Sequence, residues 1–441
     1  MISASSTAPL PKEGLGSNFY LVWLGQFVSS FGTMLSTFAL GVWLFQRTGS
    51  VLDFSTMIAF STLPAVVLLP FSGGFADRHN KQRILIACDC VAALCAATIG
   101  LLVWQDLFLP WHLYAVQFVL SVSIAFQGPA AYVTITRLVP KSQLGRASGM
   151  FALSGAISQL AAPLVAAALL ASVDLEGIVV IDLLSFAAAL AGLVLARFPA
   201  TLLASAPTAP RRALFHDFEV AIGFFERHPV LAIVFGYMSM GGFLMGCVIV
   251  LVTPMVLAAH DQAALALISS SGALGATIGG MLIVGTGGPR QWQPALLALN
   301  LSAGIALMVA GYTSSVTVLC VCAFVVMFST TTLSACVQGV WRRKVPRDCQ
   351  GSIVALQQAV ALALIPLSAI VGGTVSHFLF EPALMPDGIW ADTIGPWFGI
   401  GSGRGTGFFF LVIGMLASCA ALVSLATRRV YRLETEVPDA P

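Results

Sequence analysis

Twelve long apolar runs limit the folds available to this chain more than any other feature of its sequence. They lie at about 19–44, 53–75, 82–104, 111–138, 143–173, 177–197, 229–257, 264–284, 293–312, 316–341, 349–378 and 406–426. A helix that crosses a bilayer needs about 20 mostly apolar residues. Strands of a membrane β-barrel would instead alternate apolar and polar residues over about ten positions. The runs therefore predict an all-α integral membrane protein with 12 transmembrane helices.

The composition points to the same class of protein. Only 9% of the 441 residues are charged, against about 25% in soluble domains, so a water-soluble fold is excluded. The nine cysteines lie almost all inside the apolar runs, and no His or further Cys completes a four-ligand zinc set. We interpret them as small buried residues and expect neither a metal site nor a cofactor. The sequence has no Walker motif, so ATP is not expected to be the direct energy source.

A polar gap from Phe198 to Arg227 divides the runs into six and six. Within it, residues 214–225 carry apolar side chains at helical spacing with charges between them, which is typical of an amphipathic helix on a membrane surface. We therefore expect five parts. They are a tail at 1–18, a six-helix bundle at 19–197, a linker with an amphipathic helix at 198–228, a second six-helix bundle at 229–426 and a tail at 427–441.

Lys and Arg residues predict the orientation of the chain in the membrane. If the N-terminus is cytoplasmic, 19 of the 21 Lys and Arg residues fall in cytoplasmic segments, and only Arg47 and Arg404 lie outside. Positive residues gather on the cytoplasmic side of membrane proteins. Both termini are therefore expected in the cytoplasm.

The two halves of the chain contain similar short motifs at an offset of 206 residues. Val139-Pro140 recurs as Val345-Pro346, Gly73-Gly74 as Gly279-Gly280, and Ala166-Ala167 as Gly372-Gly373. Parallel six-helix repeats of this kind occur in a large class of secondary transporters. The repeat also identifies candidates for close helix packing, because small residues let helices approach in membranes. These candidates are Ala166, Ala167, Gly372 and Gly373, and Pro163 in the same run as Ala166 is a further packing candidate.

The densest charge cluster of the first half lies at 73–83, which reads Gly-Gly-Phe-Ala-Asp-Arg-His-Asn-Lys-Gln-Arg. This pattern resembles the loop between helices 2 and 3 of the major facilitator superfamily of transporters, with Asn80 where that family usually has Gly. The resemblance implies the major facilitator fold. It also implies an electrostatic latch, in which Asp77 meets the positive N-terminal end of helix 11 and holds the cytoplasmic side shut. The latch residues are Gly73, Gly74, Asp77, Arg78, Lys81, Arg83 and Gly351.

Two further segments resemble the macrolide-efflux branch of this superfamily, a branch of drug:proton antiporters. They are the first apolar run, from Trp23 onward, and the segment from Val139 to Arg146. Helix 4 of many proton-coupled exporters has Arg-x-x-Gln-Gly, but here Ile124 occupies the Arg position before Gln127 and Gly128. Proton coupling is therefore implied by the superfamily and not by an arginine relay in these residues.

Two acidic residues, Asp89 and Asp182, lie inside apolar runs. A charged side chain at membrane depth costs about 2.5–3.5 kcal/mol on insertion scales. We therefore expect each of these residues to have a structural or functional role. One interpretation is that they carry protons as a cavity changes sides. The other is that the basic groups of segment 73–83 hold Asp89, and that Asp182 caps a helix or pairs near the outer interface.

Other polar and aromatic residues within the runs are candidates for lining a substrate cavity, although each is also compatible with ordinary helix packing. The polar candidates are Gln26, Gln127, Gln338, Gln357 and Gln358, and the aromatic ones are Trp23, Phe27, Tyr237, Phe243 and Phe328. A cavity with few charges and many aromatic rings suits a large lipophilic ligand.

The sequence and the resemblance together predict a secondary transporter, and not an enzyme, in the bacterial cytoplasmic membrane. It would export a hydrophobic or amphipathic small molecule such as a drug, in exchange for protons, and contribute to multidrug resistance. We expect a monomer that contacts the lipid bilayer, a small lipophilic substrate and protons, and no nucleic acid. A dedicated metabolite or siderophore exporter, an uptake symporter, and a non-transporting membrane sensor or scaffold are the alternatives.

Overall fold

The computed structural model describes residues 15–140, 143–196, 198, 214–286, 292–345 and 347–426, and these residues form helices without any strand. Twelve of the helices are long and apolar enough to cross a membrane, as the sequence predicts. The spanning helices are α1 (Ser17–Thr48), α2 (Val51–Arg78), α3 (Lys81–Trp104), α4 (Pro110–Leu138), α5 (Leu144–Leu170), α6 (Asp174–Leu195), α9 (Pro229–Leu257), α10 (Gln262–Thr286), α11 (Trp292–Tyr312), α12 (Val316–Lys344), α13 (Arg347–Val375) and α16 (Arg404–Ala426).

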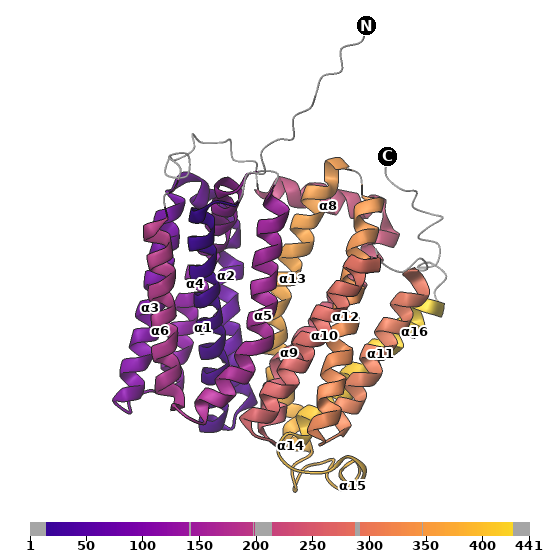
Figure 1. Cartoon of the computed structure of the whole chain (residues 1–441). Coiled ribbons are helices and arrows are strands. Elements are labelled where there is room, and N and C mark those ends of the chain that lie inside the picture. The colour runs from indigo at the N-terminus through magenta and orange to yellow at the C-terminus, as the bar shows by residue number, and fades with distance from the viewer. Residues whose placement is uncertain are drawn as a thin grey trace.

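Three short helices lie at the two ends of this bundle. Helix α8 (Leu214–Arg227) runs along one end, and α14 (Glu381–Ala383) and α15 (Gly395–Phe398) lie at the other end (Figure 1). A π-helical turn at Ser376–Phe380 joins α13 to α14. We call the two ends the α8 face and the α15 face.

The spanning helices form two six-helix bundles that lie side by side. In Figure 1 the first bundle, α1 to α6, is coloured indigo to magenta, and the second, α9 to α16, is coloured salmon to yellow. Within each bundle, glycines allow helix axes to approach closely. At Gly192 of α6, an added Cβ would lie 2.7 Å from the backbone oxygen of Leu21 in α1. Such contacts replace the hydrophobic driving force, which is weak between helices in lipid.

Contacts between the two bundles concentrate toward the α15 face. One apolar cluster contains Val42 and Phe45 of α1 together with Leu251 and Met255 of α9. A second, smaller cluster joins α2, α9 and α13. Hydrogen bonds also cross between the bundles, from Gln46 Nε2 to Gln262 Oε1 at 3.2 Å and from Ser270 Oγ to the oxygen of Leu160 at 2.7 Å.

Toward the α8 face, each apolar cluster of the described residues belongs to one bundle only. Two clusters, centred on Leu85 and on Phe19, come from the first bundle and the residues next to its helices. The cluster around Trp341 comes from α8, α9, α12 and α13 and their adjoining residues. The structure therefore represents a conformation that is closed at the α15 face and not joined by a shared apolar cluster at the α8 face.

We predict that a cysteine pair at Gln46→Cys and Gln262→Cys is cross-linked by a short bifunctional thiol reagent, in a variant without the native cysteines. The bond between these amides places their side chains together across the bundle interface. Cross-linking should also arrest transport, because it prevents the α15 face from opening. Gel mobility after protease cleavage between the halves would measure the link.

The control pair is Gln46→Cys with Val284→Cys. Val284 is 87% exposed and lies near the end of α10 at the α8 face, so this pair should not cross-link. A Gln46–Gln262 pair that stays unlinked with every reagent length would contradict the closed α15 face.

Candidate functional site

Asp89 lies in a three-helix cluster that its position in the sequence alone does not reveal. It is only 1% exposed, and its two carboxylate oxygens accept hydrogen bonds from two glutamine amides. Gln26 Nε2 of α1 donates to Oδ2 at 3.1 Å, and Gln127 Nε2 of α4 donates to Oδ1 at 2.8 Å. The structure thus brings together three residues that the sequence named separately.

Two neutral amides thus donate to the two oxygens of Asp89, and the alternative in which basic residues of segment 73–83 hold Asp89 stays a prediction. Asp89 is eight residues into α3, about 12 Å along the helix axis from its start at 1.5 Å per residue. An amide can donate to a carboxylate through its N–H or accept from a carboxylic acid through its oxygen. The cluster is therefore chemically able to hold Asp89 in either protonation state.

Asp182 lies on α6 against α1 and is 5% exposed. The hydroxyl of Ser185 lies 3.3 Å from its Oδ1, and a Cβ added to Gly32 would lie 3.0 Å from the same oxygen. Asp182 is eight residues from the start of α6 at Asp174, because this helix begins about three residues before the apolar run at 177–197. The N-cap of α6 is Val173, so Asp182 is not a helix cap.

Segment 73–83 forms the end of α2, a short connection and the start of α3. Asn80 is the N-cap of α3, because its Oδ1 accepts from the backbone N–H of Arg83 at 3.1 Å. This explains how the chain accommodates Asn where the family usually has Gly. Arg78 and Arg83 are exposed, but Lys81 is only 2% exposed, which the positive-inside pattern did not predict.

Four latch candidates belong to helices, but their burial and contacts lie outside what the structure describes. Gly73, Gly74 and Asp77 lie in the last two turns of α2, and Gly351 lies in the first two turns of α13. The contact between Asp77 and the start of α13 therefore stays a prediction.

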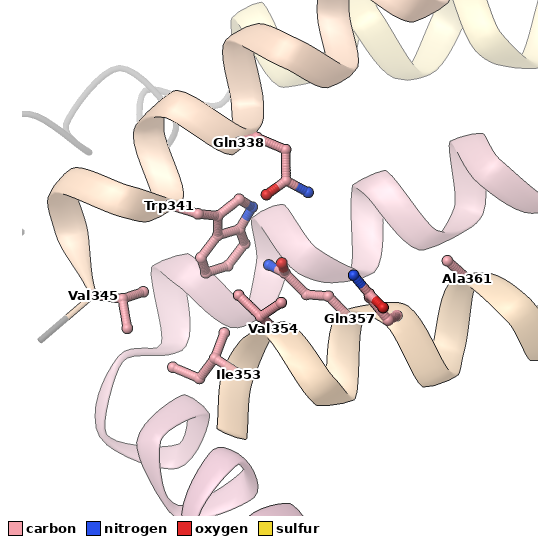
Figure 2. Close-up of a pocket in the computed structure, with 8 residues that line it drawn as sticks. Gln338, Trp341, Val345, Ile353, Val354, Gln357 and Ala361 are labelled. Carbon is pink, nitrogen blue, oxygen red and sulfur yellow. The ribbon is translucent and has the colours of Figure 1, made fainter. Parts of the chain in front are cut away.

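A pocket of about 360 Å³ lies between α12 and α13 near the α8 face (Figure 2). It brings together the three glutamines of the second half that the sequence named as cavity candidates. Its lining residues are Gln338, Trp341, Val345, Ile353, Val354, Gln357, Gln358 and Ala361.

Trp341 is the member of this pocket that the sequence reasoning missed. It directly precedes the basic run Arg342-Arg343-Lys344. This run indicates the end of a helix at the membrane surface, and Trp341 was therefore not considered as a cavity residue. The available signal was its spacing of three residues from Gln338, because residues at i and i+3 share a helix face.

The aromatic candidates do not converge on one site. Trp23 and Phe27 stack on each other with ring centroids 6.0 Å apart, on the same helix as Gln26. Phe243 packs against the cluster that joins the two bundles at the α15 face. Phe328 stacks on Phe324 at 6.1 Å, and Tyr237 is half-buried on α9.

The packing candidates lie at helix contacts. Ala166 of α5 is fully buried in a cluster that includes residues of α1, Ala167 is also buried, and Pro163 lies inside α5. A Cβ added to Gly372 would lie 3.1 Å from Cys247 Sγ of α9, and one added to Gly373 would overlap Ser55 of α2. Gly373 is therefore part of the contact between the two bundles.

The described residues contain no group of three or more His, Cys, Asp and Glu side chains that could hold a metal ion. The eight cysteines whose side chains the structure describes are free thiols. Proton transfer and hydrogen bonding are the chemistry that the described polar clusters can supply.

Comparison with known proteins agrees with this arrangement. The chain is 30% identical over 181 residues to macrolide efflux protein A of Streptococcus pyogenes, which covers 41% of this chain and 45% of that protein. It is 29% identical over 144 residues to macrolide efflux protein A of Enterococcus faecalis, covering 33% of this chain and 45% of that protein. The matched region thus spans less than half the length of these curated relatives.

Among solved structures, the fold is similar to the nucleoside transporter NupG, with a TM-score of 0.69 and 13% identity over 93% of this chain and 99% of that chain. It is also similar to a bacterial homologue of the human lysosomal transporter Spinster in an inward-facing and unoccupied conformation. That match has a TM-score of 0.66 and 16% identity over 95% of this chain and 99% of that chain.

The sequence profile of the Major Facilitator Superfamily matches residues 22–370. This range includes the whole of α1 beyond its first turn, the Asp89 cluster and the α12–α13 pocket. The chain therefore belongs to the Major Facilitator Superfamily, as a multi-pass membrane transporter and not an enzyme.

Proposed function

We propose that this transporter exports a hydrophobic or amphipathic small molecule from the bacterial cytoplasm by alternating access, in exchange for protons. The proposed direction of transport, out of the cell, is supported by the 30% identity to a protein named macrolide efflux protein A. The observation that supports proton coupling is the buried carboxylate of Asp89 between two neutral amides.

The charge distribution gives the proposed orientation. The count by segment assigns 19 of the 21 Lys and Arg residues to the side that includes the linker 198–228, so we take the α8 face as cytoplasmic and the α15 face as extracellular. The conformation with a closed α15 face is then inward-facing, the state in which an exporter takes up its substrate. Export requires the opposite state, in which the α8 face closes and the α15 face opens.

Asp89 is the proposed proton carrier. Its carboxylate is bonded to Gln26 and Gln127, which are neutral, and Ile124 stands where related exporters have arginine. A bound proton would neutralise Asp89 when water leaves the cavity, because an uncompensated charge is expensive at membrane depth. Asp182, buried among small residues of α1 and α6, is the second candidate carrier.

Expression of the protein in a bacterial host that lacks its own efflux pumps tests the proposed function. Accumulation of a panel of macrolides and other lipophilic drugs should fall relative to cells with the empty vector, and a protonophore should restore it. If the protein reaches the membrane and the accumulation of every compound is unchanged, the proposed export activity is wrong.

We predict that Asp89→Asn abolishes efflux driven by a pH gradient but preserves exchange of substrate across vesicles at equal concentrations. Asparagine keeps the size of the side chain but cannot carry a proton. Everted membrane vesicles with an imposed pH gradient would measure the first activity, and counterflow of labelled substrate the second.

Asp182→Asn and Asp106→Asn complete this experiment. Asp106 is exposed at the end of α3, so its substitution should leave both activities unchanged and serves as the matched control. Active efflux that survives both Asp89→Asn and Asp182→Asn would remove these carboxylates from the coupling mechanism.

We also predict that Asp77→Asn shifts the protein toward the inward-facing state. A carboxylate at the N-terminal end of another helix contributes about 1 kcal/mol, which corresponds to roughly a fivefold change in population. The reaction rate of a maleimide with Val354→Cys, 44% exposed on α13, would report the open population. The rate should rise in Asp77→Asn and not in Asp106→Asn, and equal rates in all three backgrounds would contradict the latch.

A further inference from the structure

We propose that a groove formed by α2, α3 and α4 binds one anionic phospholipid from the leaflet at the α8 face. The phosphate group of the lipid would lie at Arg83, and an acyl chain would lie along the groove. The groove is separate from the α12–α13 pocket, and the inference does not depend on the direction of transport or on proton coupling. It rests on the place of the groove in the membrane, its depth and the side chains that line it.

The groove lies where the end of α2 meets the first half of α3 and the second half of α4. Its volume is about 1050 Å³, at the upper limit of known ligand pockets, which is about 1,000 Å³. Most of its described lining side chains are apolar, among them Ile84 and Val91 of α3 and Val119 and Val122 of α4. The groove therefore offers a long apolar surface to a ligand.

This groove opens on the outer side of the first bundle. Helix α3 lies at the edge of that bundle, away from the second bundle (Figure 1), and its contacts are mainly with α4 and α6. Ala87 and Val91 line the groove, and Asp89 lies between them on the opposite face of α3, since two residues turn a helix by about 200°. Asp89 meets α1 and α4 there. The groove residues Phe118 and Val119 are exposed, so they contact lipid in a membrane.

The groove is as deep as one leaflet of a bilayer. Along α3 it begins at Asn80, the N-cap, and reaches Val91. Eleven residues of α-helix extend about 16 Å at 1.5 Å per residue, and half of a hydrocarbon core of about 30 Å is about 15 Å. On α4 the groove runs from Phe126 to Phe118. An acyl chain aligned with the helices would therefore lie along the groove and end near the centre of the bilayer.

The end of the groove at the α8 face is polar and contains a cation. His79, Asn80 and the exposed Arg83 line this end. The ring of His79 is fixed in place, because it stacks on Phe75 with centroids 4.1 Å apart. Its Nδ1 also donates to the backbone oxygen of Phe75 at 2.9 Å. Hydrogen-bonding groups and a guanidinium thus lie at the depth of the lipid headgroups, directly above the apolar part of the groove.

The net charge of this end is positive when every residue of the segment is counted. Segment 75–84 contains three basic residues, Arg78, Lys81 and Arg83, and one acidic residue, Asp77. Basic residues next to a membrane surface attract anionic lipids. Guanidinium groups also form strong, charge-assisted hydrogen bonds with phosphate oxygens.

An anionic phospholipid matches both parts of the groove, whereas other occupants match only one. A free phosphate would use the basic end and leave the apolar surface uncovered. A lipophilic drug would cover the apolar surface and leave Arg83 without a counter-charge. A zwitterionic phospholipid would bring a second cation next to Arg83. We therefore assign the groove to a phospholipid whose headgroup has a net negative charge.

Native mass spectrometry of the purified full-length protein tests this inference. The protein in detergent is titrated with phosphatidylglycerol and, separately, with phosphatidylcholine of the same acyl chains, and the dissociation constant of the first bound lipid is measured. Phosphatidylglycerol should bind more tightly. Arg83→Gln should weaken its binding by about fivefold, equal to roughly 1 kcal/mol, and leave the binding of phosphatidylcholine unchanged. Glycerol 3-phosphate, which has the phosphate but no acyl chain, should not compete.

A second substitution tests the apolar part of the groove. Val119→Trp places a larger side chain in the groove and should weaken the binding of both lipids. Its matched control is Leu101→Trp, at an exposed position of α3 ten residues beyond Val91. The control for Arg83→Gln is Arg47→Gln, which removes an exposed arginine at the end of α1. Both controls should bind like the wild type, and thermal unfolding would confirm that each variant is folded.

Equal affinity of the wild type for the two lipids would overturn the inference. So would a preference for phosphatidylglycerol that survives in Arg83→Gln or falls equally in Arg47→Gln, since the attraction would then come from the general surface charge. Unchanged affinities in Val119→Trp would show that no acyl chain occupies the groove. If Val119→Trp instead weakens the binding of a lipophilic drug and neither lipid is preferred, the groove belongs to the substrate path and the lipid assignment is wrong.

Discussion

The contact between the two bundles at the α15 face determines what the rest of the molecule can do. There, Gly373 of α13 lets Ser55 of α2 approach so closely that a side chain would not fit between them. Around it, residues of α1 and α9 form one apolar cluster. Since the described residues toward the α8 face form clusters within single bundles, one bundle can rotate against the other about this contact. Alternating access in such repeats is largely a rigid-body motion of this kind.

The two bundles share an architecture but differ in the chemistry of their polar groups. The first holds a carboxylate between two amides at Asp89, and the second holds three amides and an indole around a pocket. At the repeat offset of 206 residues, Asp89 corresponds to Ala295, and Trp341 corresponds to Ile135. Each polar cluster is therefore absent from the other half of the repeat. This separation is compatible with the proposed export mechanism, in which Asp89 of the first bundle carries the proton.

The sequence predicted the spanning helices well, because a chain in lipid must satisfy its backbone hydrogen bonds within each helix. It also identified Asp89 as unusual from the cost of a buried charge. It did not predict that Gln26 and Gln127 are the partners of Asp89, since these residues are 63 and 38 positions away and meet only through tertiary packing. Asn80 looked like a departure from the family pattern, yet its side chain caps α3, a role that depends on local backbone geometry. Trp341 was overlooked because a run of basic residues follows it.

The two adjacent glycines of α13 face different neighbours. Gly372 lies against Cys247 of α9, within its own bundle, and Gly373 lies against Ser55 of α2, in the other bundle. A larger side chain at the first position would oppose a contact present in every conformation of the second bundle, and it would lower the free energy of unfolding. A larger side chain at the second position would oppose a contact that exists only while the α15 face is closed. Under the proposed mechanism, neighbouring residues of one helix thus affect two separate equilibria, the folding of a bundle and the balance between the states open at either face.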